Sequence, residues 1–179
     1  MATAEQGVTA EFATSYRDMM LQGLAAEAAT TRRVLAAVPD DKSDYRPDPH
    51  ARTAWELAWH LANSDVQFLD GIADGEFKMQ SPADKPKTVA ELVDWYAKNF
   101  ARGTDRVRAM TAEQLTTAIN FLNAFNLPAF AYLGLLNNHM IHHRGALATY
   151  LRPMGSKCPS IYGGSYDEPL QGMPQSEAA

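Results

Sequence analysis

The most informative segment of this 179-residue chain is Leu135-Leu-Asn-Asn-His-Met-Ile-His-His-Arg-Gly-Ala-Leu-Ala-Thr-Tyr-Leu-Arg152. His139 and His143 stand four residues apart in it, so on a helix they share one face and can point at the same atom. Leu136 and Leu147 lie on that face as well, which predicts that both imidazoles point into the protein. A buried imidazole needs a partner for its polar nitrogens.

A third histidine, His60, lies in a separate apolar segment, Trp55-Glu-Leu-Ala-Trp-His-Leu-Ala62. With His139 and His143, it makes a divalent metal ion the simplest shared partner of the three imidazoles. Three neutral histidine ligands also leave a coordination position for water or substrate, as in a reactive site. The alternative is a helix bundle without metal, in which the three are ordinary hydrogen-bonded core histidines.

The composition excludes several classes of protein. Hydrophobic residues make up 46% of the chain and charged residues 21%, as in ordinary globular proteins. The net charge is -5 and no Lys/Arg-rich patch occurs, so nucleic acid is not an expected partner. The single cysteine, Cys158, cannot form an internal disulfide, which favours a reducing compartment.

Neither a signal peptide nor a membrane span is predicted. The N-terminal residues lack a basic region followed by an apolar core. Ile119–Ile141 carries no Asp, Glu, Lys or Arg, but it contains five asparagines and Pro128, which are costly in a bilayer core. We interpret that segment as a buried helix with its lead-in and expect a cytoplasmic protein.

Apolar residues at helical spacing predict four long helices, at 10–37, 53–75, 88–110 and from about 126 or 127 to 152. Two of them begin at capping-box sequences, Thr53-x-x-Glu56 and Thr88-x-x-Glu91, and Pro128 fits the first turn of the last. Thr111-x-x-Gln114 predicts a short extra turn, and 116–126 is left unassigned. No strand alternation is visible, so an antiparallel helix bundle in a single domain, 1–179, is expected, with an irregular tail from about 153.

The segment Asn138-His-Met-Ile-His-His-Arg-Gly-Ala-Leu-Ala-Thr-Tyr-Leu-Arg-Pro-Met-Gly155, followed by Pro159-Ser-Ile-Tyr162, resembles the C-terminal signature of the DinB family (DinB/YfiT-like metalloenzymes). Trp59-His60-Leu61, with Asp65 and Phe68-Leu-Asp-Gly71, is similar to the second-helix motif of that family. One departure is Ala146, where many members have glutamine.

The resemblance implies an all-α, four-helix bundle with up-down-down-up topology. It also implies a divalent metal ion, Zn²⁺ or Ni²⁺, held by His60, His139 and His143. A homodimer follows from the resemblance together with a surplus of apolar and aromatic side chains on several helices.

Several residues near this motif have two readings. His142 has a supporting or solvent-facing role, or replaces His143 as ligand, because residues three apart also share a helix side. Glu56 is the capping carboxylate, or a general base four residues before His60. Arg144 pairs with an acidic group on another helix, or binds an anionic substrate. Gly145 in mid-helix indicates a close approach of another helix.

Three further positions are candidates for supporting the site. Asp65, Tyr132 and Tyr150 orient a ligand imidazole, line the pocket, or are core or surface residues. No catalytic residue is assigned from the sequence. A di-iron centre is disfavoured because no Glu-x-x-His motif occurs.

Two functions remain. The first is a metal-dependent enzyme acting on a small-molecule substrate, either a hydrolase or an S-transferase that activates a low-molecular-weight thiol, as relatives of the resembled family do. The second is a non-catalytic metal-binding or stress-response interaction protein, in which the ion holds the second and fourth helices together.

Overall fold

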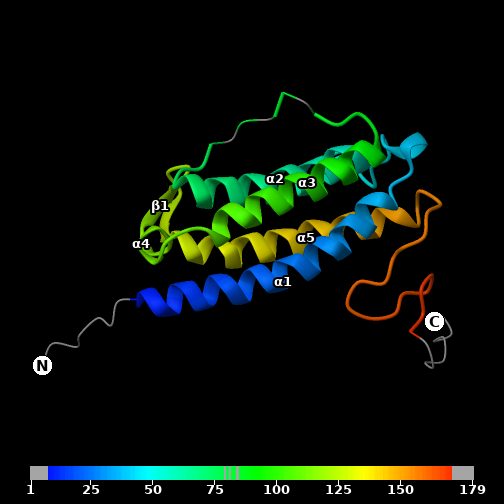
Figure 1. Cartoon of the computed structure of the whole chain (residues 1–179). Helices are drawn as coiled ribbons and strands as arrows, with labels where there is room; N and C mark the ends of the chain where they lie inside the picture. Colours follow the sequence, from blue (N-terminus) through cyan, green and yellow to red (C-terminus); the bar gives the residue numbers. More distant parts are fainter. Residues whose placement is uncertain (1–7, 79, 81, 84, 171–179) are drawn as a thin grey trace, which may run out of the picture.

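Four long helices pack side by side in the computed structural model, which describes residues 8–78, 80, 82–83 and 85–170. They are α1 (Ala10–Ala36), α2 (Ala54–Asp74), α3 (Val89–Arg108) and α5 (Tyr132–Leu151) (Figure 1). The mostly helical fold predicted from the sequence is therefore confirmed. The expectations for Met1–Gly7 and for residues 171–179 lie outside the described residues.

Short elements fill the connections. They are η1 (Asp40–Lys42), α4 (Ala112–Thr116), β1 (Ala118–Phe121), β2 (Phe125–Pro128) and η2 (Ala129–Ala131). Thr111 caps the start of α4: its hydroxyl accepts the Gln114 N–H, while the Gln114 side chain accepts the Thr111 N–H. The predicted extra turn is therefore present.

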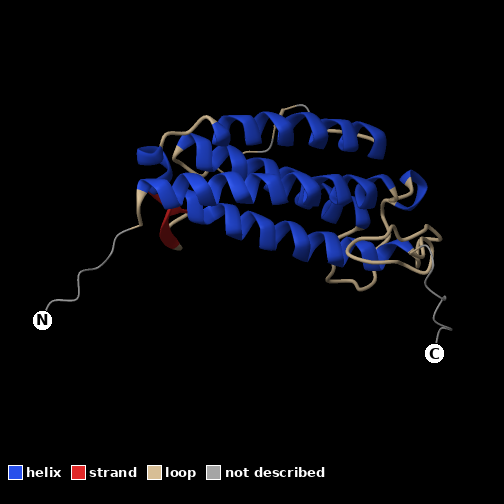
Figure 2. Cartoon of the chain, turned by 60° about the horizontal axis from the view of Figure 1, so that its bottom comes forward, coloured by secondary structure: helices blue, strands red, loops and turns tan. Residues whose placement is uncertain are grey.

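The expectation that strands are absent is wrong. β1 and β2 form an antiparallel hairpin at one end of the bundle (Figure 2), with Ala118 opposite Pro128 and Phe121 opposite Phe125. Leu122 and Asn123 adopt positive φ angles of 50° and 63° at the turn.

The start predicted for the last helix, at Asn126 or Leu127, is wrong for the same reason. Both residues lie in β2, and the helix α5 begins only at Tyr132. The Tyr132 hydroxyl donates to the Ile119 carbonyl at 2.7 Å and accepts the Leu127 N–H at 3.2 Å. These two bonds fix the hairpin on the first turn of α5.

Side-chain contacts give the directions of the helices. Asp65 of α2 meets Tyr96 of α3, and further along α2 Leu69 faces Gly103, so α2 and α3 run in the same direction (Figure 1). His60 of α2 meets His143 of α5, whereas Asp65 meets the earlier residue His139, so α2 and α5 run in opposite directions. His60 therefore faces His139 and His143 across the interface between α2 and α5, which we call the α2–α5 seam.

The segment after α5 has no helix or strand through residue 170, as predicted, but it folds back on the bundle. The Ser156 hydroxyl donates to the Ala37 carbonyl, and the Tyr162 hydroxyl donates to the Glu27 carboxylate at 2.9 Å. Arg33 forms an ion pair with Glu168. Among the described residues, no helix has both the length and the apolar character to cross a membrane.

Candidate metal centre

The helix α2, which carries His60, begins with a capping box. The Thr53 hydroxyl accepts the Glu56 N–H, and the Glu56 carboxylate accepts the Thr53 N–H at 2.8 Å, so the predicted capping box is present. Glu56 is exposed and occupied by this cap. The capping interpretation of Glu56 thus has direct structural support, and His60 lies about one turn further along the same helix.

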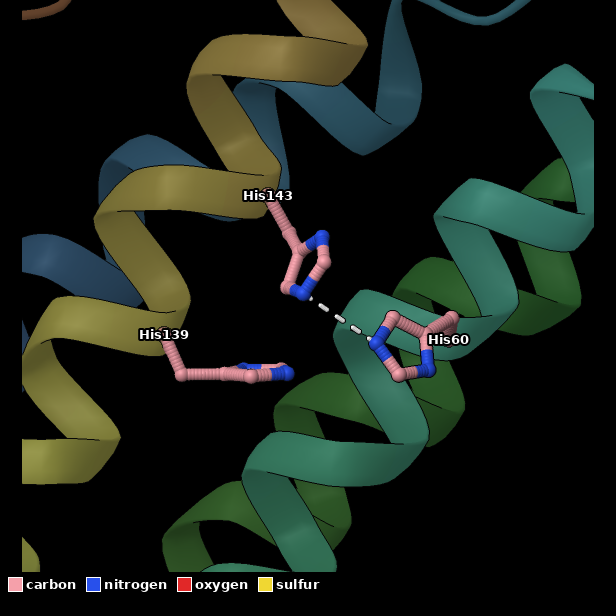
Figure 3. A group of neighbouring side chains, drawn as sticks. All are labelled: His60, His139 and His143. Carbon is pink, nitrogen blue, oxygen red and sulfur yellow. Dashed lines mark hydrogen bonds between the residues drawn. The ribbon is translucent and has the colours of Figure 1, made fainter. Parts of the chain in front are cut away.

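The structure brings His60, His139 and His143 together between α2 and α5 (Figure 3). Each imidazole offers one nitrogen, and these three atoms lie within 4.8 Å of one another. The Nε2 atoms of His60 and His143 are 3.2 Å apart. All three side chains are half-buried, so the group they form is neither sealed in the core nor open on the surface.

This spacing fits a shared cation. Two nitrogens that each bind a tetrahedral zinc ion at ~2.05 Å lie ~3.3 Å apart, close to the separation of the two Nε2 atoms. Without a cation, two facing imidazole nitrogens need a proton between them, because two lone pairs repel. The described residues that meet in this group are three histidines, and no cysteine or carboxylate joins them.

The outer nitrogens of two of the imidazoles have hydrogen-bond partners. The Ser64 hydroxyl lies 3.3 Å from Nδ1 of His60, one turn along α2. The Asp65 carboxylate lies 3.2 Å from Nδ1 of His139. Both contacts occupy Nδ1 and leave Nε2 for the centre of the group, as in metal sites where an outer partner orients each histidine.

Asp65 is the most deeply buried group of this set, with 0% of the residue exposed. Its second carboxylate oxygen accepts a hydrogen bond from the Tyr96 hydroxyl at 3.0 Å, which comes from α3. Burial raises the pKa of Asp65 to about 6, and the hydrogen bond from His139 opposes that rise. The orienting role considered for Asp65 therefore matches its position.

The electrostatics keep two of the imidazoles neutral. Burial, assisted by the positive charge of Arg52, lowers the pKa of His60 to about 4. Burial and the neighbouring His139 lower the pKa of His143 to about 4 as well. At neutral pH both rings therefore keep a free lone pair, which is the form that binds a metal ion.

The other candidate residues lie elsewhere. His142 is exposed and outside the group, although its ring centre is 4.7 Å from that of His143. The Cys158 N–H donates to the Asp167 carboxylate in the folded-back segment. The hydroxyl of Tyr150 lies 3.3 Å from the Arg52 carbonyl, which ties the C-terminal half of α5 to the start of α2.

Two expectations for the Arg144-Gly145 pair have different outcomes. Arg144 forms an ion pair with Glu27 of α1, as the acidic-partner interpretation predicts. Gly145 is exposed, and an added Cβ there would meet no atom within 4 Å, so the predicted close helix approach is wrong. The close approach lies instead at Gly103 of α3, where an added Cβ would stand 2.7 Å from the Leu69 Cβ.

Sequence reasoning missed two residues that support the histidines. Ser64 had a usable signal, because it follows His60 by four residues and so lies on the same side of α2. Tyr96 had none, because it stands 31 positions from Asp65 and at an ordinary apolar position of α3. Only the parallel packing of α2 and α3 brings its hydroxyl to Asp65.

The fold and the histidine group define the class of protein: a helix bundle in which three histidines could hold a metal ion. The model of the DinB family matches residues 10–176, and the chain belongs to this family. The chain is 29% identical over 129 residues to the protein YjoA of Bacillus subtilis (strain 168). The aligned residues cover 70% of this chain and 82% of YjoA. It is 25% identical over 155 residues to YrdA of the same organism, covering 84% of this chain and 90% of YrdA.

Solved structures agree with this assignment. The crystal structure of YjoA superposes with a TM-score of 0.67 at 23% identity, covering 80% of this chain and 97% of YjoA. A DinB-like protein from Bacillus cereus ATCC 10987 gives a TM-score of 0.68 at 25% identity, covering 80% and 95%. A DinB-family protein from Exiguobacterium sibiricum 255-15 gives 0.60 at 22% identity, covering 78% and 92%.

Proposed function

We propose that His60, His139 and His143 bind one divalent metal ion, zinc or nickel, through their Nε2 atoms. The observation that carries this proposal is the convergence of three imidazole nitrogens within 4.8 Å. The hydrogen bonds to Nδ1 of His60 and His139 support it, because they leave Nε2 free in both rings. Membership of the DinB family supports it independently.

We further propose that the protein is a metal-dependent enzyme of the thiol S-transferase or hydrolase type, with a low-molecular-weight thiol as cosubstrate in the first case. A divalent ion held by three neutral ligands supplies a positive charge and an open position that acidifies water or a thiol. The side chain of His139 is 19% exposed, so a small molecule can approach the group from solvent. The ring of Phe68, centred 5.6 Å from that of His139, offers an apolar contact beside it.

A non-catalytic role remains the second candidate, in metal binding or as a stress-response interaction protein. It is favoured by the position of the histidines across the α2–α5 seam, where an ion would join two helices. Turnover separates the two functions, because a purely structural ion gives no thiol-dependent or hydrolytic product.

Three further expectations complete the proposal. The chain forms one domain whose long helices have up-down-down-up topology, which the opposite directions of α2 and α5 and the shared direction of α2 and α3 support. It forms a homodimer, which light scattering at micromolar concentration tests. It acts in the cytoplasm, in keeping with its single cysteine.

The metal is tested by elemental analysis of the purified protein and by zinc titration of the chelator-treated protein. We expect one ion per chain in the wild type and none in His143→Ala. The matched control is His142→Ala, which removes the exposed neighbouring imidazole and leaves metal binding unchanged. Equal binding by both variants would contradict the assignment, and a thiol-dependent activity screen of the loaded protein then tests catalysis.

A further inference from the structure

The three histidines differ in what holds them. Nδ1 of His139 faces a buried carboxylate, that of Asp65, at 3.2 Å. Nδ1 of His60 faces the hydroxyl of Ser64 at 3.3 Å, and a hydroxyl both donates and accepts. Of these two partners, the carboxylate that faces His139 is the one that dictates where the proton of the imidazole lies.

The hydrogen-bond chemistry at Asp65 fixes that proton. An ionised carboxylate only accepts hydrogen bonds, and both oxygens of Asp65 are engaged: one by the Tyr96 hydroxyl, which donates, and one by His139. Nδ1 of His139 must then carry the hydrogen. A neutral imidazole protonated at Nδ1 has its lone pair on Nε2, the atom that faces the group.

Tyr96 holds Asp65 from the opposite side. The ring of Tyr96 is 0% exposed and belongs to α3, which supplies none of the three histidines. Its hydroxyl occupies the Asp65 oxygen that His139 does not use, so the carboxylate cannot rotate without losing a buried hydrogen bond. The chain of contacts therefore runs from α3 through α2 to α5.

From these contacts we infer that Asp65 and Tyr96 are positioning residues, which fix His139 in the tautomer and orientation that bind the metal ion through Nε2. This inference rests on the proposed function. It makes His139 the pre-organised ligand of the three and assigns α3 an indirect part in the site.

The first test needs no metal. In the ¹⁵N NMR spectrum of the metal-free wild-type protein, we expect His139 to be the Nδ1–H tautomer. Asp65→Asn should reduce that population, because the amide group of asparagine can donate to Nδ1 and so favour the hydrogen on Nε2. A wild-type His139 that carries its hydrogen on Nε2 would overturn the inference, whether or not the protein binds metal.

The second test is zinc affinity, measured by competition with a chromophoric chelator, together with the absorption spectrum of the Co²⁺-loaded protein. We expect Asp65→Asn to weaken zinc binding by roughly 10- to 100-fold and to alter the Co²⁺ spectrum, as replacement of an outer hydrogen-bond partner typically does. Tyr96→Phe should weaken binding in the same direction by a smaller factor.

The matched control is Tyr132→Phe, which removes a buried tyrosine hydroxyl that bonds to the hairpin and not to Asp65. It should leave zinc affinity and the Co²⁺ spectrum as in the wild type. Wild-type affinity in both Asp65→Asn and Tyr96→Phe would refute the positioning role while leaving the metal site intact. Absence of zinc binding by the wild type would instead refute the proposed function, and the tautomer measurement would still decide the role of Asp65. If Asp65→Asn does not fold, Tyr96→Phe and the wild-type tautomer carry the test.

Discussion

The guanidinium of Arg144, with 1% of its side chain exposed, is paired with the carboxylate of Glu27 across the α1–α5 interface. It also donates to the Glu27 carbonyl at 3.1 Å and to the Tyr162 hydroxyl at 2.6 Å. Arg144 follows His143 directly in the sequence but makes these contacts with α1 and the C-terminal segment. The position directly after His143 thus serves the packing of α5 on α1.

Removing Glu27 should destabilise the protein strongly. Glu27→Ala leaves the buried Arg144 charge without its counter-ion, and loss of one partner of such a pair costs about 3 kcal/mol. The free energy of unfolding in urea measures the effect. The double variant Glu27→Met with Arg144→Met removes both charges and should recover most of the loss. Zinc affinity should stay at the wild-type value in Glu27→Ala, since the carboxylate of Glu27 is paired with Arg144 across the α1–α5 interface and not with one of the three histidines.

Two glycines should respond to alanine in opposite directions. Gly103→Ala places a Cβ 2.7 Å from the Leu69 Cβ, and forced overpacking of this kind costs about 1–3 kcal/mol. Gly145→Ala meets no atom within 4 Å on an exposed helix position, so it should stabilise the protein by about 1 kcal/mol. Thermal unfolding of the two variants checks both signs. A stabilised Gly103→Ala protein would contradict the close contact of α2 and α3.

The metal-free protein should lose stability as the pH falls from 6.5 towards 4, because the imidazoles of His60 and His143 resist protonation in the folded state. The pKa of His60 and of His143 is lowered to about 4 in the folded chain, mainly by burial, whereas the ordinary value is 6.5. Between these values the unfolded chain binds protons at both positions and the folded chain does not, so the folded state is disfavoured by acid. The NMR titration of the imidazole protons should give midpoints near 4, and a midpoint near 6.5 for either ring would contradict the burial.

Asp65 has the opposite effect on the free energy of unfolding over part of the same pH range. Burial raises its pKa from 3.8 to about 6, so between these values the folded chain holds a proton that the unfolded chain has released. This contribution stabilises the fold at low pH and is lost as the pH rises through about 6. Asp65→Asn should therefore make the acid destabilisation of the metal-free protein steeper, as urea unfolding at pH 5 and pH 7 can measure.

Metal binding should raise the stability of the folded chain. An ion that binds only the native state adds about 2.7 kcal/mol to the free energy of unfolding when its free concentration is 100 times the dissociation constant. We expect this increase for the wild type and for His142→Ala on addition of zinc, and no increase for His143→Ala. An equal increase in His143→Ala would place the ion elsewhere.

The sequence was a good guide where a local rule acts within one turn of helix. Thr53-x-x-Glu56 and Thr111-x-x-Gln114 form the reciprocal hydrogen bonds that their spacing predicts. The four-residue spacing of His139 and His143 likewise places both on the face of α5 that meets α2. Such patterns need only helix geometry, which the residues themselves determine.

The parts that the sequence did not predict depend on contacts between distant segments. The segment Ala118-Ile-Asn-Phe121 is short and is flanked by asparagines, so its sequence does not predict a strand. The hairpin depends on the hydroxyl of Tyr132, which anchors it to α5. The return of the C-terminal segment depends on Arg33 and Glu168, which are 135 positions apart. The hydrogen bond from Tyr96 to Asp65 needs the parallel packing of two helices.

His60 and His143 come from two antiparallel helices, so the geometry of the site depends on how far α5 is shifted along α2. A slip of α5 by one turn along α2 moves its side chains by about 5.4 Å, more than the 4.8 Å that now encloses the three nitrogens. A bound ion would therefore select a single alignment of the two helices among those that apolar packing alone tolerates. Any force or partner that shifts α5 lengthwise would in turn release the ion, so the loading of the site would report the state of the bundle.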